Sequence, residues 1–246
     1  MKNTAPYFKI ESFGAVDGPG IRLVVFLSGC PYKCIYCHNP ESWIYDKKNV
    51  ISVNEVIKQY KKNLVFYKNG GITISGGEPL MHKTFCLQLA RKCYKEKISL
   101  AIDTSGATFV NSNLPFFKSI VKYFPLWIVD IKSINPKIHQ SITRTTDELR
   151  ELELLKFIDK NNNHSWIRQV CLNKYTDNKN DLINTGKFIK TLKNVDKFET
   201  IPFHQFAISK YEELKINYKL SKEKSTTKAK AKKCREYIME GMKIKS

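Results

Sequence analysis

The sequence has no run of 18 apolar residues, which excludes a membrane-spanning helix. Its first ten residues contain neither the apolar region nor the small-residue cleavage site of a signal peptide. We therefore expect no signal peptide, a cytoplasmic location and no membrane partner. Apolar residues nevertheless make up 42% of the chain, enough to bury a core, and this excludes a wholly disordered protein.

Arginine is scarce in a chain that is otherwise strongly basic. Lys and Arg together number 42 against 23 Asp and Glu, which gives a net charge of +19, but only six of the basic residues are Arg. Arg makes the bidentate contacts by which proteins read bases and phosphates, whereas evenly scattered Lys is typical of a solvated surface. We therefore predict no nucleic-acid partner, and the charge favours attraction of an acidic one.

The seven cysteines are an odd number, and three of them (Cys30, Cys34 and Cys37) lie within eight residues. In a reducing compartment such a cluster indicates metal or redox chemistry rather than a disulfide framework. Three thiolates on one loop can hold three corners of a [4Fe–4S] cluster and leave the fourth iron open to a small molecule. Zinc would need a fourth ligand, and the c-type haem motif, which Cys34–His38 matches, is usual in exported proteins.

Six short, mainly apolar runs predict strands that are buried on both faces. Helix-like stretches separate them, and the first begins with a capping box at Ser52 and Glu55. This alternation predicts an α/β fold with a parallel sheet, and its spacing fits an incomplete (β/α)6 barrel of the TIM type better than a full barrel. An open doubly wound sheet is the alternative. The predicted strands are 21–27, 71–75, 98–103, 127–131, 166–171 and 198–203, and the predicted helices are 52–67, 83–95, 111–123, 147–160, 178–192 and 227–239.

The chain is expected to form one domain over residues 1–246. Within it we expect a cluster loop at residues 28–40 and a basic helical segment at about residues 221–246. The length agrees with this, because single α/β barrels reach roughly 250 residues.

Polar groups follow the ends of the predicted strands. Because the carboxyl ends of parallel strands meet at one rim, where active sites lie, we expect these groups to share a site. Asp103 is either a helix N-cap or part of a cation site. Arg168 lies inside a strand, where an ion pair at the sheet surface is an equally good interpretation. The other groups are Gly76, Gly77, Glu78, Asp130, Lys132 and His204.

These residues and their neighbours resemble the pyruvate formate-lyase activating enzymes, a family of radical S-adenosylmethionine (SAM) activases. The most specific feature is the cysteine triplet with Tyr36 before its last member. The resemblance runs in family order from about Ser12 to Leu214. The matching stretches are SFGAVDGPGIRLVVFLSGCPYKCIYCHNPESW, GGITISGGEPL, AIDTSGA, IVDIKSINPKIHQ, WIRQV and IPFHQFAISKYEEL.

The resemblance implies a role for each matching residue. Cys30, Cys34 and Cys37 would hold a [4Fe–4S] cluster, and SAM would bind its open iron. Asp103 would bind a monovalent cation, and Asp17 would meet the substrate peptide. The residues implied to contact SAM or to lie beside the cluster are Tyr36, Asn39, Gly76, Gly77, Glu78, Asp130, Lys132, Arg168 and His204.

The resemblance also implies the reaction. An electron from a flavodoxin or ferredoxin would reduce the cluster, SAM would be cleaved to a 5′-deoxyadenosyl radical, and this radical would take a hydrogen from a glycine of pyruvate formate-lyase. A monomer acting anaerobically is expected. One alternative is an activase of a different glycyl radical enzyme, although the ferredoxin insert that such activases often carry is missing between Pro40 and Glu55. The other is an iron–sulfur electron carrier.

The chain departs from the family pattern in three places. Asn173-Lys174 replaces a Pro-Gly pair, Arg144 replaces a Gly, and the match is poor beyond about Leu220. These departures lie away from the cysteines, so they concern partner docking more than chemistry.

Overall fold

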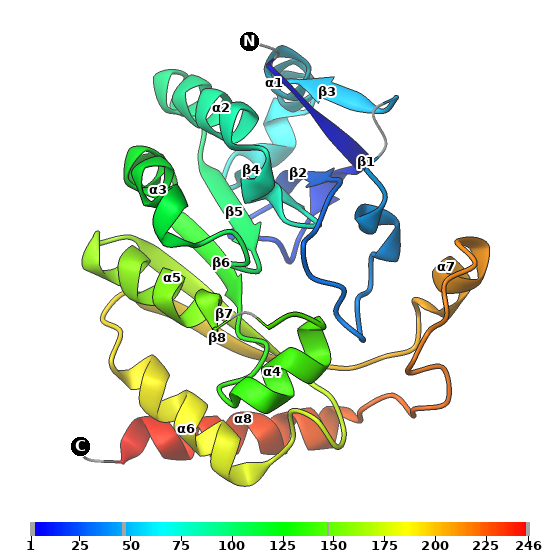
Figure 1. Ribbon diagram of the computed structural model, residues 1–246. Helices are drawn as coiled ribbons and strands as arrows, with labels where there is room; N and C mark the ends of the chain where they lie inside the picture. Colours follow the sequence, from blue (N-terminus) through cyan, green and yellow to red (C-terminus); the bar gives the residue numbers. More distant parts are fainter. Residues whose placement is uncertain (1–2, 46–47, 147, 245–246) are drawn as a thin grey trace.

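The computed structural model describes residues 3–45, 48–146 and 148–244, and one eight-stranded sheet runs through them (Figure 1). The strand order is β3-β1-β2-β4-β5-β6-β7-β8. Six strands, β2 and β4 to β8, pair in parallel, whereas β1 is antiparallel to both β2 and β3. The strands are β1 (Thr4–Gly14), β2 (Arg22–Leu27), β3 (Val50–Ser52), β4 (Gly71–Gly76), β5 (Leu100–Thr104), β6 (Leu126–Asp130), β7 (His164–Cys171) and β8 (Val195–Pro202).

The six parallel strands are those that the apolar runs predict, and they follow one another in chain order. A doubly wound sheet reverses its strand order at a switch point, so this order is that of a barrel. The barrel is incomplete because the sheet ends at β3 on one side and at β8 on the other. The two N-terminal strands β1 and β3 were not predicted.

The helices follow the strands and cover the outer face of the sheet (Figure 1). Prediction and structure agree over Lys83–Lys95, and the capping box forms, since the amide of Glu55 donates to Ser52 Oγ (3.2 Å). The first helix ends at Lys62 rather than Tyr67, and α4 and α7 were not predicted. Asp147, at the start of one predicted helix, lies outside the described residues. The helices are α1 (Val53–Lys62), α2 (Lys83–Lys95), α3 (Leu114–Ile120), α4 (Pro136–Thr143), α5 (Arg150–Lys160), α6 (Lys179–Lys190), α7 (Ile208–Glu213) and α8 (Lys228–Lys243).

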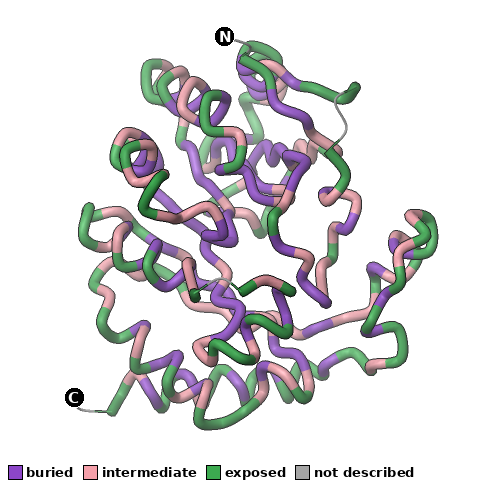
Figure 2. Tube along the Cα trace, in the orientation of Figure 1, coloured by how far each residue is buried: buried purple, intermediate pink, exposed green. Residues whose placement is uncertain are grey.

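The core lies between the strands and their helices, where the tube in Figure 2 is mostly purple. Trp127 of β6 and Ile74 of β4 are fully buried there. The C-terminal helix α8 packs against α6 through close backbone contact, because a Cβ on Gly186 would come within 1.9 Å of the Ile238 carbonyl oxygen. In the described part of the chain, none of the helices has the length and apolarity to cross a bilayer.

Residues 203–227 form an extended segment, here called the α7 arm, between β8 and α8. In Figure 1 this arm carries α7 away from the other helices, at the right of the view. It returns to the sheet at Thr226, whose amide donates to the carbonyl of Phe203 (2.8 Å). The arm therefore starts and ends at the rim of the barrel and places a short helix beyond it.

Candidate active site

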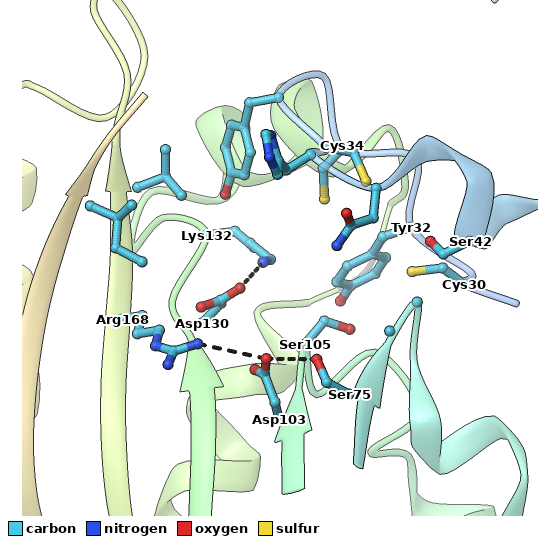
Figure 3. A pocket seen from close by; sticks show the side chains of 18 of the residues that line it. Cys30, Tyr32, Cys34, Ser42, Ser75, Asp103, Ser105, Asp130, Lys132 and Arg168 are labelled. Atoms are coloured by element: carbon cyan, nitrogen blue, oxygen red, sulfur yellow. Dashed lines mark hydrogen bonds and ion pairs between the residues drawn. The ribbon is translucent and has the colours of Figure 1, made fainter. Parts of the chain in front are cut away.

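A cavity of about 360 Å³ opens among the carboxyl ends of the parallel strands (Figure 3). The sheet supplies side chains of β4 to β8, and the loop after β2 supplies the cysteines. The structure brings together all but one of the residues for which the sequence predicts a role in this site. Those on its wall are Asp17, Cys30, Cys34, Tyr36, Cys37, Asn39, Gly76, Gly77, Asp103, Asp130, Lys132, Arg168 and His204.

The cysteine loop is held by backbone hydrogen bonds to the end of α4. The amides of Lys33 and Ile35 donate to the carbonyls of Thr143 (3.1 Å) and Ile142 (2.9 Å). Within the loop, the amide of Cys37 donates to the carbonyl of Cys34 (2.9 Å) and closes a tight turn. Two thiols of the triplet are thereby fixed on one turn, facing the same cavity as the third.

The surroundings of the thiols fit an iron–sulfur cluster. Burial raises the pKa of all three thiols, that of Cys34 to about 12. Thiolates form in such a place only beside strong positive charge, which iron provides. A Cβ on Gly77 would come within 2.2 Å of the Gly29 carbonyl oxygen and 3.1 Å of the Cys30 Cβ, so glycine is needed for this close approach. Among the described residues, no three His, Cys, Asp or Glu side chains are grouped to hold a single metal ion.

Asp130 and Lys132 form an ion pair inside the cavity. Lys132 Nζ lies 2.8 Å from Asp130 Oδ2, and the lysine side chain is 7% exposed. Burial alone would lower the pKa of Lys132, but the Asp130 carboxylate raises it well above its ordinary value. The same ammonium lies 5.9 Å from the centre of the Tyr36 ring. Lys132 is therefore a permanent cation at neutral pH, directed into the cavity beside the cysteine loop.

Arg168 of β7 and Asp103 of β5 approach each other across the intervening strand β6 (Figure 3). Arg168 Nη1 lies 3.6 Å from Asp103 Oδ2, and Ser75 Oγ donates to the same oxygen (2.8 Å). Burial raises the pKa of Asp103 to about 6, although Arg168 acts against this. The structure places Arg168 on the cavity wall and also gives it ion pairs, so contact between Arg168 and SAM stays a prediction. The counter-charge that the structure gives Asp103 is this guanidinium, and binding of a monovalent cation by Asp103 stays a prediction.

His204 lies on the cavity wall and contacts two other rings. Its ring centre is 4.6 Å from that of His38 and 4.4 Å from that of Phe206. Its Nδ1 atom is buried and has no hydrogen-bond partner among the described residues. A buried polar atom of this kind normally has a partner, so Nδ1 is available to a bound molecule.

Asp17 lies in the turn between β1 and β2 and lines the same cavity. Its carbonyl accepts a hydrogen bond from Thr73 Oγ1 (2.6 Å), and the carbonyl of Val16 accepts one from Arg168. These two bonds tie the turn before β2 to β4 and β7. Burial raises the pKa of Asp17, and the nearby Arg168 partly offsets this effect.

Glu78 is the one predicted site residue that does not line the cavity. Its carboxylate is fully buried and accepts hydrogen bonds from Leu80 N (3.0 Å), Ser105 N (2.9 Å) and the hydroxyls of Thr104 and Ser105. These bonds join the turn after β4 to the end of β5. Glu78 therefore fixes Thr104 and Ser105, which do line the cavity, rather than pointing into it.

The α7 arm holds the cysteine loop from its far side, a contact that sequence reasoning missed. Lys210 Nζ lies 2.7 Å from Glu41 Oε1, 3.0 Å from Asn39 Oδ1 and 3.1 Å from the carbonyl of His38. Tyr211 donates its hydroxyl to the carbonyl of Cys37 (3.1 Å). Both residues lie in the IPFHQFAISKYEEL stretch, so the signal was present, but no local pattern assigns them a partner more than 170 residues away.

Comparison with known families agrees with this geometry. A family described as a 4Fe-4S single cluster domain matches residues 16–150. Among solved structures, a radical SAM methyltransferase from Sphaerobacter thermophilus superposes with a TM-score of 0.63 over 89% of this chain and 64% of its own, at 12% identity. The fold and the cysteine site thus define a protein with a [4Fe–4S] cluster domain on a partial barrel like that of the methyltransferase, which confirms the predicted fold and the predicted cluster.

The particular family follows from its sequence relatives. The pyruvate formate-lyase-activating enzyme of Clostridium pasteurianum is 35% identical over 94% of this chain and 95% of its own length. The enzyme of the same name from Streptococcus mutans is 37% identical over 88% of this chain and 84% of its own. The chain belongs to the family of pyruvate formate-lyase-activating enzymes, as its motifs predicted.

Proposed function

We propose that this chain generates a glycyl radical on pyruvate formate-lyase, that is, it activates formate C-acetyltransferase. The observation that carries the proposal is a single cavity that joins the cysteine triplet, the Asp130–Lys132 pair and Asp17. The cysteine triplet and the Asp130–Lys132 pair can bind a cluster and SAM, and Asp17 can bind a peptide backbone. The names of the two relatives support the choice of partner, since both are activating enzymes of pyruvate formate-lyase.

In this proposal Cys30, Cys34 and Cys37 bind the cluster and leave one iron for SAM. When bound, the cluster and SAM supply the electron and the hydrogen-abstracting radical, and the protein supplies binding and orientation. Lys132 and His204 offer hydrogen-bonding groups to SAM, and both act in the cavity rather than on the fold. The remaining residues proposed for the SAM side of the cavity are Tyr36, Asn39, Gly76, Gly77, Asp130 and Arg168.

Asp17 has a separate role in the proposal. A glycine backbone that enters a closed site needs acceptors for its N–H groups, because an unpaired buried donor costs roughly 1–3 kcal/mol. The Asp17 carboxylate lies on the cavity wall, on a turn that Thr73 and Arg168 hold in place. It can accept such a bond without moving far, which suits the recognition of a protein substrate.

The proposal extends to the physiological partners. A net charge of +19 favours an acidic electron donor such as a flavodoxin or ferredoxin, since opposite charge speeds encounter. We further propose a single-domain monomer acting in the cytoplasm. We also propose that Asp103 binds a monovalent cation. Measuring SAM binding with and without potassium would test this.

The experiment that tests the proposal is anaerobic reconstitution with iron and sulfide, followed by dithionite and SAM. Methionine release measures SAM cleavage, and electron paramagnetic resonance measures the radical on pyruvate formate-lyase. Cys→Ser variants of the triplet should lose iron and both activities. The matched control is Cys93→Ala, since Cys93 is buried on α2 away from the cavity.

Three outcomes separate the candidates. SAM cleavage with a radical on pyruvate formate-lyase supports the proposal. SAM cleavage with a radical only on another glycyl radical enzyme supports the alternative activase. Reversible reduction without SAM cleavage would support an electron carrier and contradict the proposal.

A further inference from the structure

Two buried cysteines outside the active site lie side by side. Cys171 ends β7, Cys234 lies in α8, and their sulfur atoms are 2.6 Å apart although the residues are 63 positions apart in sequence. Cys171 is 1% exposed and Cys234 is 2% exposed. Neither lines the cavity, so the function proposed above does not use this pair.

The backbone around the pair keeps the two sulfurs together. Thr226 Oγ1 donates to the carbonyl of Cys171 (2.9 Å), and Thr200 Oγ1 donates to the carbonyl of Ala231 (2.9 Å), one turn before Cys234. An ion pair between Lys230 Nζ and Asp177 Oδ2 (2.7 Å) joins the same helix to the segment after β7. The approach of the sulfurs is therefore fixed by bonds on both elements, not by one flexible side chain.

The pair also has the chemistry of a thiol–disulfide couple. A hydrogen bond between the two sulfurs lowers the pKa of Cys234, while it raises that of Cys171. A thiolate is the reactive form of cysteine, and here it would form in contact with the sulfur that it has to join. Disulfides need closely placed Cβ atoms on elements that do not have to move, which two packed elements provide.

We propose that Cys171 and Cys234 are a redox-active dithiol whose disulfide fastens α8 to β7. In the oxidation, each thiol loses one proton and one electron, and a bond forms between the two sulfur atoms. Molecular oxygen, to which an anaerobic protein is exposed on aeration, takes up the two electrons and two protons and becomes hydrogen peroxide. Thiol reductants reverse the reaction.

The disulfide would act on the wall of the active site. Strand β7 carries Arg168 and Val170 into the cavity, and Cys171 follows them directly. A covalent link would keep the end of this strand and α8 together after oxygen has destroyed the cluster. The proposal thus predicts an oxidised protein that keeps its fold while it has lost its cofactor.

The test starts from reconstituted protein, one half kept anaerobic and the other aerated. Both halves are alkylated in denaturant and digested with trypsin without reduction. Cys171 falls in the peptide QVCLNK (169–174) and Cys234 in the dipeptide CR (234–235). We expect the two peptides joined in the aerated sample and alkylated in the anaerobic one.

A second measurement follows the effect on stability. After cluster removal, aerated wild-type protein should melt at a higher temperature than the same protein treated with dithiothreitol. Cys234→Ala should abolish this difference, and Cys93→Ala should retain it. If QVCLNK stays alkylated after aeration, or joins a peptide of the cysteine triplet instead, the proposal is wrong, whatever the protein activates.

Discussion

Replacement of Glu78 separates a scaffold role from a cofactor role. The family resemblance implies that Glu78 frames the amino group of SAM, whereas in the structure its carboxylate accepts hydrogen bonds from Leu80, Thr104 and Ser105 and is fully buried. We therefore expect Glu78→Ala to act first on the stability of the rim where β4 and β5 end.

The magnitude follows from the hydrogen bonds that are lost. In Glu78→Ala the backbone N–H groups of Leu80 and Ser105 lose their acceptor and are fixed in place, whereas the hydroxyls of Thr104 and Ser105 are free to rotate about their C–O bonds. Each buried unpaired donor costs roughly 1–3 kcal/mol, so the two together cost about 2–6 kcal/mol. Glu78→Gln keeps one carbonyl oxygen and leaves only one N–H unpaired, so its expected cost is about half as large.

The assay is thermal melting of anaerobically reconstituted protein, paired with SAM binding by calorimetry. For a chain of this length, the Ala variant should melt on the order of 10 °C below wild type, with Gln in between. SAM binding by the folded Gln variant should stay near wild type. A Glu78→Ala protein that melts like wild type but no longer binds SAM would refute the reasoning and make Glu78 a cofactor ligand.

Three further predictions concern other parts of the molecule. Lys210→Met should release iron to a chelator several-fold faster, because it removes the contacts of Lys210 with the cysteine loop and leaves only that of Tyr211. Lys174→Met, which removes an exposed ion pair with the same arm, is the control, and equal rates would contradict the prediction. Burial lowers the pKa of His82, so the stabilising contribution of His82 is complete above pH 6.5 and declines as the pH falls below that value. Urea titrations at several pH values from 5 to 7 give the free energy of unfolding, and this free energy should depend less steeply on pH in His82→Gln than in wild type. Asp17→Asn should cleave SAM with dithionite at the wild-type rate but place far less radical on pyruvate formate-lyase, and equal loss in both assays would move Asp17 to the cofactor side.

The inner parallel strands could be predicted because they are buried on both faces and therefore mainly apolar, as in Leu23, Val24 and Val25 of β2. Strand β1 could not, since it lies near the edge of the sheet, carries Pro6 and alternates irregularly between exposed and buried residues. Helix α7 is only six residues long, too short to show a helical period.

The site was predictable where one residue type and its position decide the chemistry, as with the cysteine triplet and the groups at strand ends. The site was not predictable where the direction of the backbone decides which way a side chain points. Gly76 has a φ of +123°, and the turn that this conformation begins sends Glu78 into the protein instead of the cavity. Lys210 and the pair of Cys171 with Cys234 were missed because their partners are remote in sequence.

The reach of the α7 arm has a consequence for the order of events during biosynthesis. Lys210 binds the carbonyl of His38, 172 residues earlier in the chain. At roughly 5–20 residues per second, a ribosome adds Lys210 on the order of 10–30 s after the cysteine loop has been made. During that interval the three cysteines exist without the α7 arm, and until Ile142 and Thr143 are made they also lack the bonds to the end of α4. We therefore expect stable insertion of iron only after Lys210 has been added, and a truncation before Lys210 should yield a protein that loses its cluster faster.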